Sequence, residues 1–247
     1  MPLSEEQKIR YARQLISQEI GEKGQEKLLN SKVLQIGAGG LGSSFAMYLV
    51  AAGIGELTII DNDTVDLSNL QRQILYDSSS LNRVKVEVAK ERLNNINPDS
   101  KIIIKKMCVD DKSIDDLIKN KDYIVDCSDN AKTKFMVNDA AIRNNVKCTI
   151  AGVKDFYGQM ITINPKKSAC YRCVFYGEPE KQPKKESPLP IIGVTPGILG
   201  TLEAVEVIKS LLNIGETLEN NLLMVNLLNM SFDKIPVQKH EKCICSK

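Results

Sequence analysis

The sequence predicts an α/β fold in which a largely parallel sheet carries helices on both faces. Short apolar runs alternate with segments of helical length from residue 32 to residue 150, the pattern of parallel strands joined by crossover helices. A glycine-rich loop joins the first apolar run to the first of these helices. From Gly158 onward the alternation changes, and we expect an antiparallel C-terminal extension there.

The chain opens with an expected helix, because Ser4 and Gln7 have the spacing of a capping box. Apolar residues then recur with helical period at Ile9, Ala12, Leu15 and Ile16, and a second short helix follows. Strands are expected at residues 32–36, 57–60, 102–104, 123–125 and 148–150, with helices at residues 41–52, 84–95 and 131–143. Further strands are expected at residues 159–163 and 222–228, with a helix at residues 199–212 after Pro196. The lysine- and proline-rich residues 178–190 are interpreted as a mobile crossover loop.

Length and composition indicate one globular unit. The 247 residues are 43% hydrophobic and 26% charged, which is ordinary for a soluble protein. The 33 basic and 31 acidic residues leave a net charge of +2, which does not supply the basic surface of a nucleic-acid-binding protein. The N-terminal segment lacks the apolar core of a signal peptide, and the apolar residues 45–54 are too few to span a membrane. We expect a cytoplasmic protein that binds neither nucleic acid nor membrane.

The glycine loop predicts a nucleotide site. Gly37, Gly39, Gly40 and Gly42 follow an expected strand and open an expected helix, where backbone N–H groups can bind phosphate. Asp61 ends the next strand, near the offset at which a carboxylate accepts hydrogen bonds from ribose hydroxyls. A tight turn without a ligand is the structural alternative. These residues alone also fit a nicotinamide-dependent dehydrogenase.

Four further stretches decide between nucleotides. They are residues 10–14 (RYARQ), residues 67–73 (LSNLQRQ), Lys85, and residues 126–130 (DCSDN). Together with the glycine loop they resemble the ThiF/MoeB/HesA adenylyltransferases, relatives of the ubiquitin-activating enzymes, over nearly the whole chain. The resemblance implies a Rossmann-like fold in a single adenylation domain, residues 1–247. Its parts would be N-terminal helices (1–30), a nucleotide-binding half (31–155), and a half that binds the carrier and zinc (156–247).

The resemblance also implies an activity: ATP-dependent adenylation of the C-terminal carboxylate of a small ubiquitin-like sulfur-carrier protein with a Gly-Gly tail. Charge must be neutralised while pyrophosphate leaves, and in the family Arg72 and Lys85 would do this, with Asn69 as a neutral donor. Asp61 would hold the ribose and Asp129 would coordinate Mg²⁺. The arginine matching Arg13 reaches into the neighbouring subunit's site, which implies a homodimer.

Each charged residue has a structural alternative. Arg13 and Lys85 could be solvated on charged helix faces, and Asp129 could only cap the following helix. The carrier pathway, whether thiamine, molybdopterin or another, is left open. Three other functions also stay open: an NAD-dependent oxidoreductase, a docking scaffold for a ubiquitin-like protein, and an enzyme adenylating another peptide, a small carboxylate or a tRNA-linked carboxylate.

Four of the seven cysteines form two close pairs, Cys170 with Cys173 and Cys243 with Cys245. Two such pairs can hold Zn²⁺ through four thiolates, and family members resemble this with C-x-x-C at both ends. The second pair here is C-x-C, so participation of His240 is an alternative, as is a redox pair or no metal. A bound zinc would tie the C-terminal tail to the middle of the chain.

The segment between Cys173 and Cys243 contains no cysteine. Some relatives use a cysteine in the crossover loop to accept the activated carrier, so we expect adenylation alone, with sulfur delivered by a separate donor. The remaining thiols, Cys108, Cys127 and Cys148, lie in or beside expected strands and are interpreted as buried apolar residues.

Overall fold

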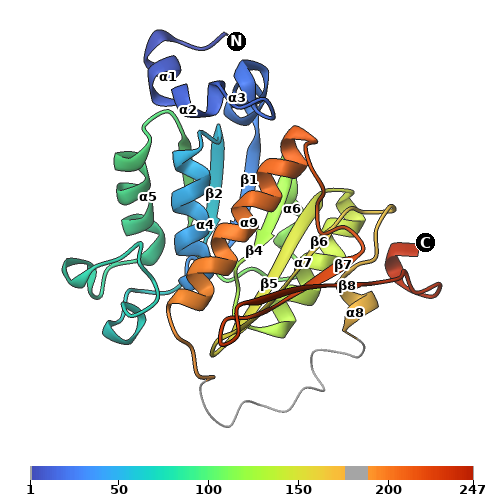
Figure 1. Cartoon of the computed structure of the whole chain (residues 1–247). Coiled ribbons are helices and arrows are strands. Elements are labelled where there is room, and N and C mark those ends of the chain that lie inside the picture. The colour runs from blue at the N-terminus through green and yellow to red at the C-terminus, as the bar shows by residue number, and fades with distance from the viewer. Residues whose placement is uncertain (1, 176–188, 247) are drawn as a thin grey trace.

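The computed structural model describes residues 2–175 and 189–246, which are built around an eight-stranded sheet (Figure 1). The strand order is β3-β2-β1-β4-β5-β6-β7-β8. The bounds are β1 (Lys32–Ile36), β2 (Glu56–Ile60), β3 (Lys101–Lys105), β4 (Tyr123–Asp126), β5 (Lys147–Lys154), β6 (Tyr157–Ile163), β7 (Asn221–Asn226) and β8 (Ser231–Pro236). The first five strands pair in parallel and β5 to β8 pair antiparallel, so the predicted fold class is confirmed.

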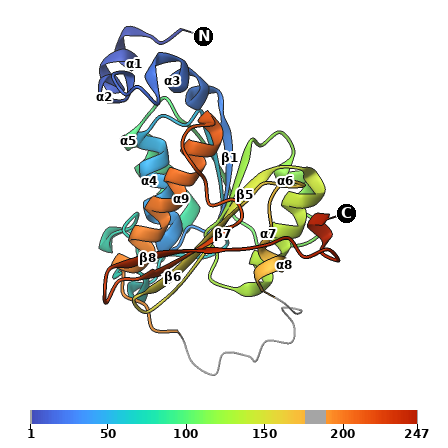
Figure 2. The same cartoon turned by 45° about the vertical axis from the view of Figure 1, so that its right-hand side comes forward.

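Helices cover both faces of this sheet (Figures 1 and 2). One face carries α4 (Gly40–Ala51), α5 (Lys85–Ile96) and α9 (Val194–Leu212), and their apolar side chains form one core. The other face carries α6 (Ile114–Ile118), α7 (Ala131–Asn144) and α8 (Tyr171–Val174) over a second core. Within the described residues, no helix combines the length and apolar character needed to cross a membrane.

The N-terminal segment forms short helices instead of one continuous amphipathic helix: α1 (Glu5–Arg10), α2 (Ala12–Leu15) and α3 (Gly21–Asn30). The capping box of Ser4 and Gln7 is confirmed. The first two helices are separated at Tyr11, which is buried and whose hydroxyl accepts a hydrogen bond of 2.9 Å from the Asn97 side chain. The expected apolar face is not buried, since Ile9 is 79% exposed and Ile16 is 73% exposed.

Several elements were not predicted. Helix α6 is five residues long, α8 begins inside the C-x-x-C pair, and β8 is largely exposed, so none carries a long apolar pattern. Helix α9 begins five residues before the expected start, with Pro196 in its first turn, where a missing N–H costs no helical hydrogen bond. The expected mobile loop, residues 178–190, lies outside the described residues except for its last two.

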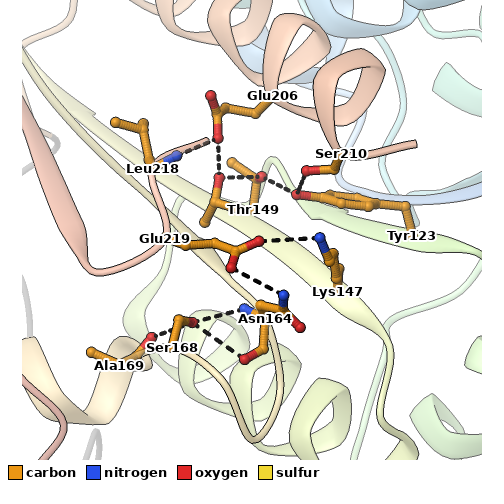
Figure 3. A network of polar contacts seen from close by, with 11 residues as sticks. Tyr123, Lys147, Thr149, Asn164, Ser168, Ala169, Glu206, Ser210, Leu218 and Glu219 are labelled. Atoms are coloured by element: carbon orange, nitrogen blue, oxygen red, sulfur yellow. Dashed lines mark hydrogen bonds and ion pairs between the residues drawn. The ribbon is translucent and has the colours of Figure 1, made fainter. Parts of the chain in front are cut away.

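A buried polar network attaches α9 to the sheet (Figure 3). The Glu206 carboxylate accepts hydrogen bonds from the Thr162 hydroxyl at 2.6 Å and from the Leu218 backbone N–H at 2.8 Å. The Thr162 hydroxyl lies 3.1 Å from that of Thr149, which lies 2.9 Å from the Tyr123 hydroxyl. Tyr123, Thr149 and Thr162 come from β4, β5 and β6. Through Glu206 the network therefore fixes α9 against three strands and thereby positions the first turn of this helix.

Candidate functional site

A cavity of about 1180 Å³ opens at the carboxyl ends of β1, β2 and β4, where ligands of open α/β sheets bind. The first turn of α9 and the surface of β5, β6 and β7 complete its wall. Eight of the predicted site residues line it: Gly37, Gly39, Gly40, Asp61, Asn69, Arg72, Lys85 and Asp129. Gly42 and Arg13 do not line the cavity.

The glycine loop brings the backbone close to neighbouring chain segments. Gly37 has a φ of +93°, and a Cβ there would lie 2.8 Å from the Cys127 carbonyl oxygen. A Cβ on Gly42 would lie 2.3 Å from the Gly37 carbonyl oxygen, so this glycine permits the close approach of helix and strand. Since α4 begins at Gly40, its N-terminal N–H groups and dipole face the cavity.

Asp61 connects the end of β2 to this loop. Its Oδ2 accepts a hydrogen bond of 2.8 Å from the Ala38 N–H, and its Oδ1 accepts one of 2.8 Å from the Asp63 N–H. The carboxylate is half-buried and lines the cavity. Each carboxylate oxygen has a further lone pair, so Asp61 can accept ribose hydroxyls without losing these bonds.

Asn69 and Arg72 are held by a short 3₁₀ helix, η1 (Leu67–Asn69). Asp66 caps this helix, and hydrogen bonds from Ser68 lower the pKa of the Asp66 carboxyl group. Asn69 Oδ1 accepts from the Asp66 N–H at 3.4 Å, and Arg72 Nη1 donates to the Ser68 carbonyl at 2.9 Å. The turn thus positions an amide and a guanidinium group along one wall of the cavity.

Lys85 is the first residue of α5, and its side chain is 5% exposed. Its Nζ lies 3.0 Å from Asp63 Oδ2. The alternative of a solvated lysine is therefore wrong. Its ammonium group is a buried positive charge in the wall of the cavity.

Asp129 lies in the loop between β4 and α7 and is exposed toward the cavity. The N-cap of α7 is Asn130, whose side chain accepts a hydrogen bond of 2.9 Å from the Thr133 N–H. The capping role considered for Asp129 thus belongs to its neighbour. An exposed carboxylate offers the oxygen donors that Mg²⁺ prefers in proteins.

Arg13 is exposed on α2 and is absent from the cavity lining. Its neighbour Tyr11 packs at Gly53, just beyond the C-terminal end of α4, whereas the N-terminal end of α4 faces the cavity. The described chain therefore does not bring Arg13 to its own site. In the single chain, Arg13 is therefore a solvent-exposed surface residue.

The four paired cysteines converge into one cluster. The sulfur of Cys170 lies 3.9 Å from that of Cys173 and 3.4 Å from that of Cys243, and Cys173 Sγ lies 3.5 Å from Cys245 Sγ. Four sulfurs at about 2.3 Å from a tetrahedral zinc would be about 3.8 Å apart, so the donor set fits zinc. His240 Nδ1 accepts from the Lys242 N–H at 3.3 Å, and the four sulfurs, which all lie within 4.8 Å of one another, are enough for a four-coordinate site.

A family model described as the ThiF family matches residues 11–246. The chain belongs to the ThiF family. The SAMP-activating enzyme E1 of Haloferax volcanii is 35% identical, covering 96% of this chain and 88% of that protein. The sulfur carrier protein adenylyltransferase of Thermus thermophilus is 34% identical, with 98% and 92% covered.

The sulfur carrier protein ThiS adenylyltransferase of Escherichia coli K12 is 38% identical, with 82% of this chain and 81% of that protein covered. Among solved structures, the crystal structure of E. coli MccB with ATP matches with a TM-score of 0.82 at 24% identity. That match covers 91% of this chain and 69% of the MccB chain. It supports the fold described here.

Lys134 is a site residue that sequence reasoning missed in this ThiF-family chain. It lines the cavity from α7, and its buried Nζ lies 2.8 Å from Asp126 Oδ2 and 2.7 Å from the Ser128 carbonyl oxygen. It therefore holds the loop that carries Asp129. The available signal was a lysine beside Phe135 on a helix expected to pack against the sheet.

Glu203, which does not line the cavity but contacts the cavity residue Cys127, was also missed. It is fully buried on α9, where Cys127 Sγ donates to its Oε2 at 3.5 Å, and burial raises its pKa well above the ordinary value. Burial likewise raises the pKa of Cys127. Cys127 and Cys148 are buried as predicted, but the prediction for Cys108 is wrong. Cys108 lies beyond the end of β3, where it is exposed and lines the cavity.

Proposed function

We propose that this chain is an adenylyltransferase that activates the C-terminal carboxylate of a small sulfur-carrier protein with ATP. The observation that carries the proposal is the meeting of a helix N-terminus, Arg72, Lys85 and Asp129 in one cavity. A dinucleotide site needs a phosphate loop and a ribose acceptor, whereas two cations and a further carboxylate suit a triphosphate with Mg²⁺. Full-length relatives named as sulfur carrier protein adenylyltransferases support the same activity.

In the proposed reaction, a carboxylate oxygen of the carrier attacks the α-phosphorus of ATP. A new C–O–P linkage forms, the bond from the α-phosphorus to the bridging oxygen breaks, and pyrophosphate leaves with the electron pair. Arg72 and Lys85 stabilise the charge that develops on the phosphate oxygens, and the Asn69 amide donates a further hydrogen bond. Asp61 binds the ribose. Asp129 would hold Mg²⁺, which supplies additional charge neutralisation when bound.

The cavity also has room for the carrier tail, because its volume exceeds the usual range of about 300–1,000 Å³ for one small ligand. Its far wall is formed by Tyr157 and Gln159 on β6 and Met224 on β7. We place the carrier on residues 156–247, where Met230 and Phe232 of the β7–β8 hairpin are exposed. A Gly-Gly tail could enter the cavity in a narrow space because glycine has no side chain.

The active enzyme is proposed to be a homodimer in which Arg13 serves the partner's cavity. Arg13 lies between the exposed apolar residues Ile9 and Ile16, and such side chains favour burial in an interface. Zinc is proposed at the four cysteine sulfurs, where it would tie the C-terminal residues to α8. We propose a cytoplasmic location, because cysteines stay reduced there and ATP is available.

The proposed product is released as acyl-adenylate. No cysteine lies between Cys173 and Cys243, so the expected acceptor is a separate sulfur donor. The test is carrier-dependent exchange of labelled pyrophosphate into ATP. Exchange with a Gly-Gly carrier, lost when the two glycines are removed, supports the proposal. Exchange driven only by another peptide or a small carboxylate would transfer the assignment to a related adenylating enzyme, and NADH binding without ATP binding would refute it.

A further inference from the structure

Lys85 contacts Asp63 at two points, one through its ammonium group and one through its backbone N–H. Lys85 Nζ lies 3.0 Å from Asp63 Oδ2, and the Lys85 backbone N–H donates to the Asp63 carbonyl at 3.0 Å. The Asp63 side chain is 60% exposed, while that of Lys85 is 5% exposed. Within the described residues, Asp63 is the one ion-pair partner of this buried cation. A buried charge keeps its position only when a partner compensates it, so the location of Lys85 depends on Asp63.

Asp63 is itself fixed by the nucleotide site. Its N–H donates to Asp61 Oδ1 at 2.8 Å, and the other oxygen of Asp61 accepts from the Ala38 N–H of the glycine loop at 2.8 Å. A bridge between Thr64 and Val84 joins the same two segments. An uninterrupted chain of contacts thus runs from the glycine loop through Asp61 and Asp63 to the lysine ammonium.

We propose that Asp63 is a positioning residue that sets the place of the Lys85 ammonium relative to the phosphate groups. The inference rests on the proposed binding of ATP in this cavity. Asp63 acts through Lys85 and takes no part in bond making. A carboxylate at the exposed rim can retain one side of the ammonium group while phosphate oxygens occupy another, because an ammonium group has three donors.

The test measures pyrophosphate exchange for Asp63→Asn, which removes the charge and nearly preserves the shape. Loss of one charge-assisted contact predicts a fall in kcat of about tenfold or more. The KM for ATP is expected to change by less than about threefold, because the loss of positioning is offset by removal of a negative charge near the triphosphate. Asp111→Asn is the matched control: Asp111 is exposed, follows the cavity segment 107–109, and has no ion-pair partner within the described residues. Its kcat is expected to stay at the wild-type value.

Two further variants separate positioning from general damage. Asp63→Glu keeps the carboxylate and is expected to recover part of the lost kcat. In the double variant with Lys85→Met, Asp63→Asn is expected to cause no further loss beyond about twofold, because its effect passes through the absent ammonium group. Wild-type kcat in Asp63→Asn, no recovery in Asp63→Glu, or independent losses in the double variant would each overturn the inference. Absence of exchange in the wild-type protein would instead overturn the proposed function.

Discussion

Replacing Lys134 with methionine tests how the cavity loop is held. The Lys134 ammonium group contacts Asp126 Oδ2 at 2.8 Å and the carbonyl oxygens of Ser128 and Ala151 at 2.7 and 2.5 Å. The side chains of Lys134 and Asp126 are 8% and 0% exposed. Methionine fills similar space but leaves a buried carboxylate without a counterion, which costs about 3–5 kcal/mol of unfolding free energy. That is a large share of a typical total of about 5–15 kcal/mol.

The assay is urea unfolding followed by circular dichroism, with Lys132→Met as the control. Lys132 is exposed on the same helix, so its variant is expected to remain within about 0.5 kcal/mol of the wild type. Pyrophosphate exchange by folded Lys134→Met should also fall, because the loop carrying Asp129 loses its anchor. If the unfolding free energy of Lys134→Met lay within about 1 kcal/mol of the wild-type value, the inferred contribution of the buried ion pair would be refuted.

Three other outcomes follow from the structure. Because burial raises the pKa of Glu203, the folded state keeps a proton that the unfolded state releases above about pH 4.5; stability then falls by up to about 1.4 kcal/mol per pH unit. Glu203→Gln should remove this slope. If the unfolding free energies of variant and wild type changed equally with pH between about pH 5 and 8, the burial argument would be contradicted. Elemental analysis should find about one zinc per chain, lost in Cys243→Ser and kept in His240→Ala; loss in the histidine variant would change the ligand set. Arg13→Ala and Asp129→Ala, each inactive alone, should regain about a quarter of wild-type exchange when mixed, since half of the dimers are mixed and each has one intact site. No recovery would exclude a shared site.

The parallel part of the fold was predictable because each element there carries its own local signal. The strands β1 (KVLQI) and β2 (ELTII) are short, mainly apolar segments, and the glycine loop marks the turn between β1 and α4. The missed elements lack such signals. Strand β8 gains its order from pairing with β7, and its exposed side chains do not alternate in burial. Tyr11 divides the N-terminal helix because Asn97, distant in sequence, binds its hydroxyl.

The residues of the candidate site likewise divide into those with a local sequence signal and those without one. Residues at strand ends, such as Asp61 and Asp129, were predictable because parallel strands bring their carboxyl ends to one edge. Lys134 and Glu203 were not, because their roles come from burial beside Asp126 and Cys127, and burial is a property of the folded packing. Cys108 was misplaced because a residue beyond the last ladder position of a strand escapes the burial of that strand.

The position of Arg13 determines how it could take part in catalysis. Tyr11 packs at Gly53 beyond one end of α4, and Gly40 faces the cavity at the other end. Twelve helical residues span about 18 Å, which is well beyond the length of an arginine side chain. A short displacement of α2 would not close this distance, and its anchor, Tyr11, is buried. Arg13 therefore does not reach the cavity of its own chain, so under the proposed homodimer its effect on exchange would measure the dimer and the shared site together.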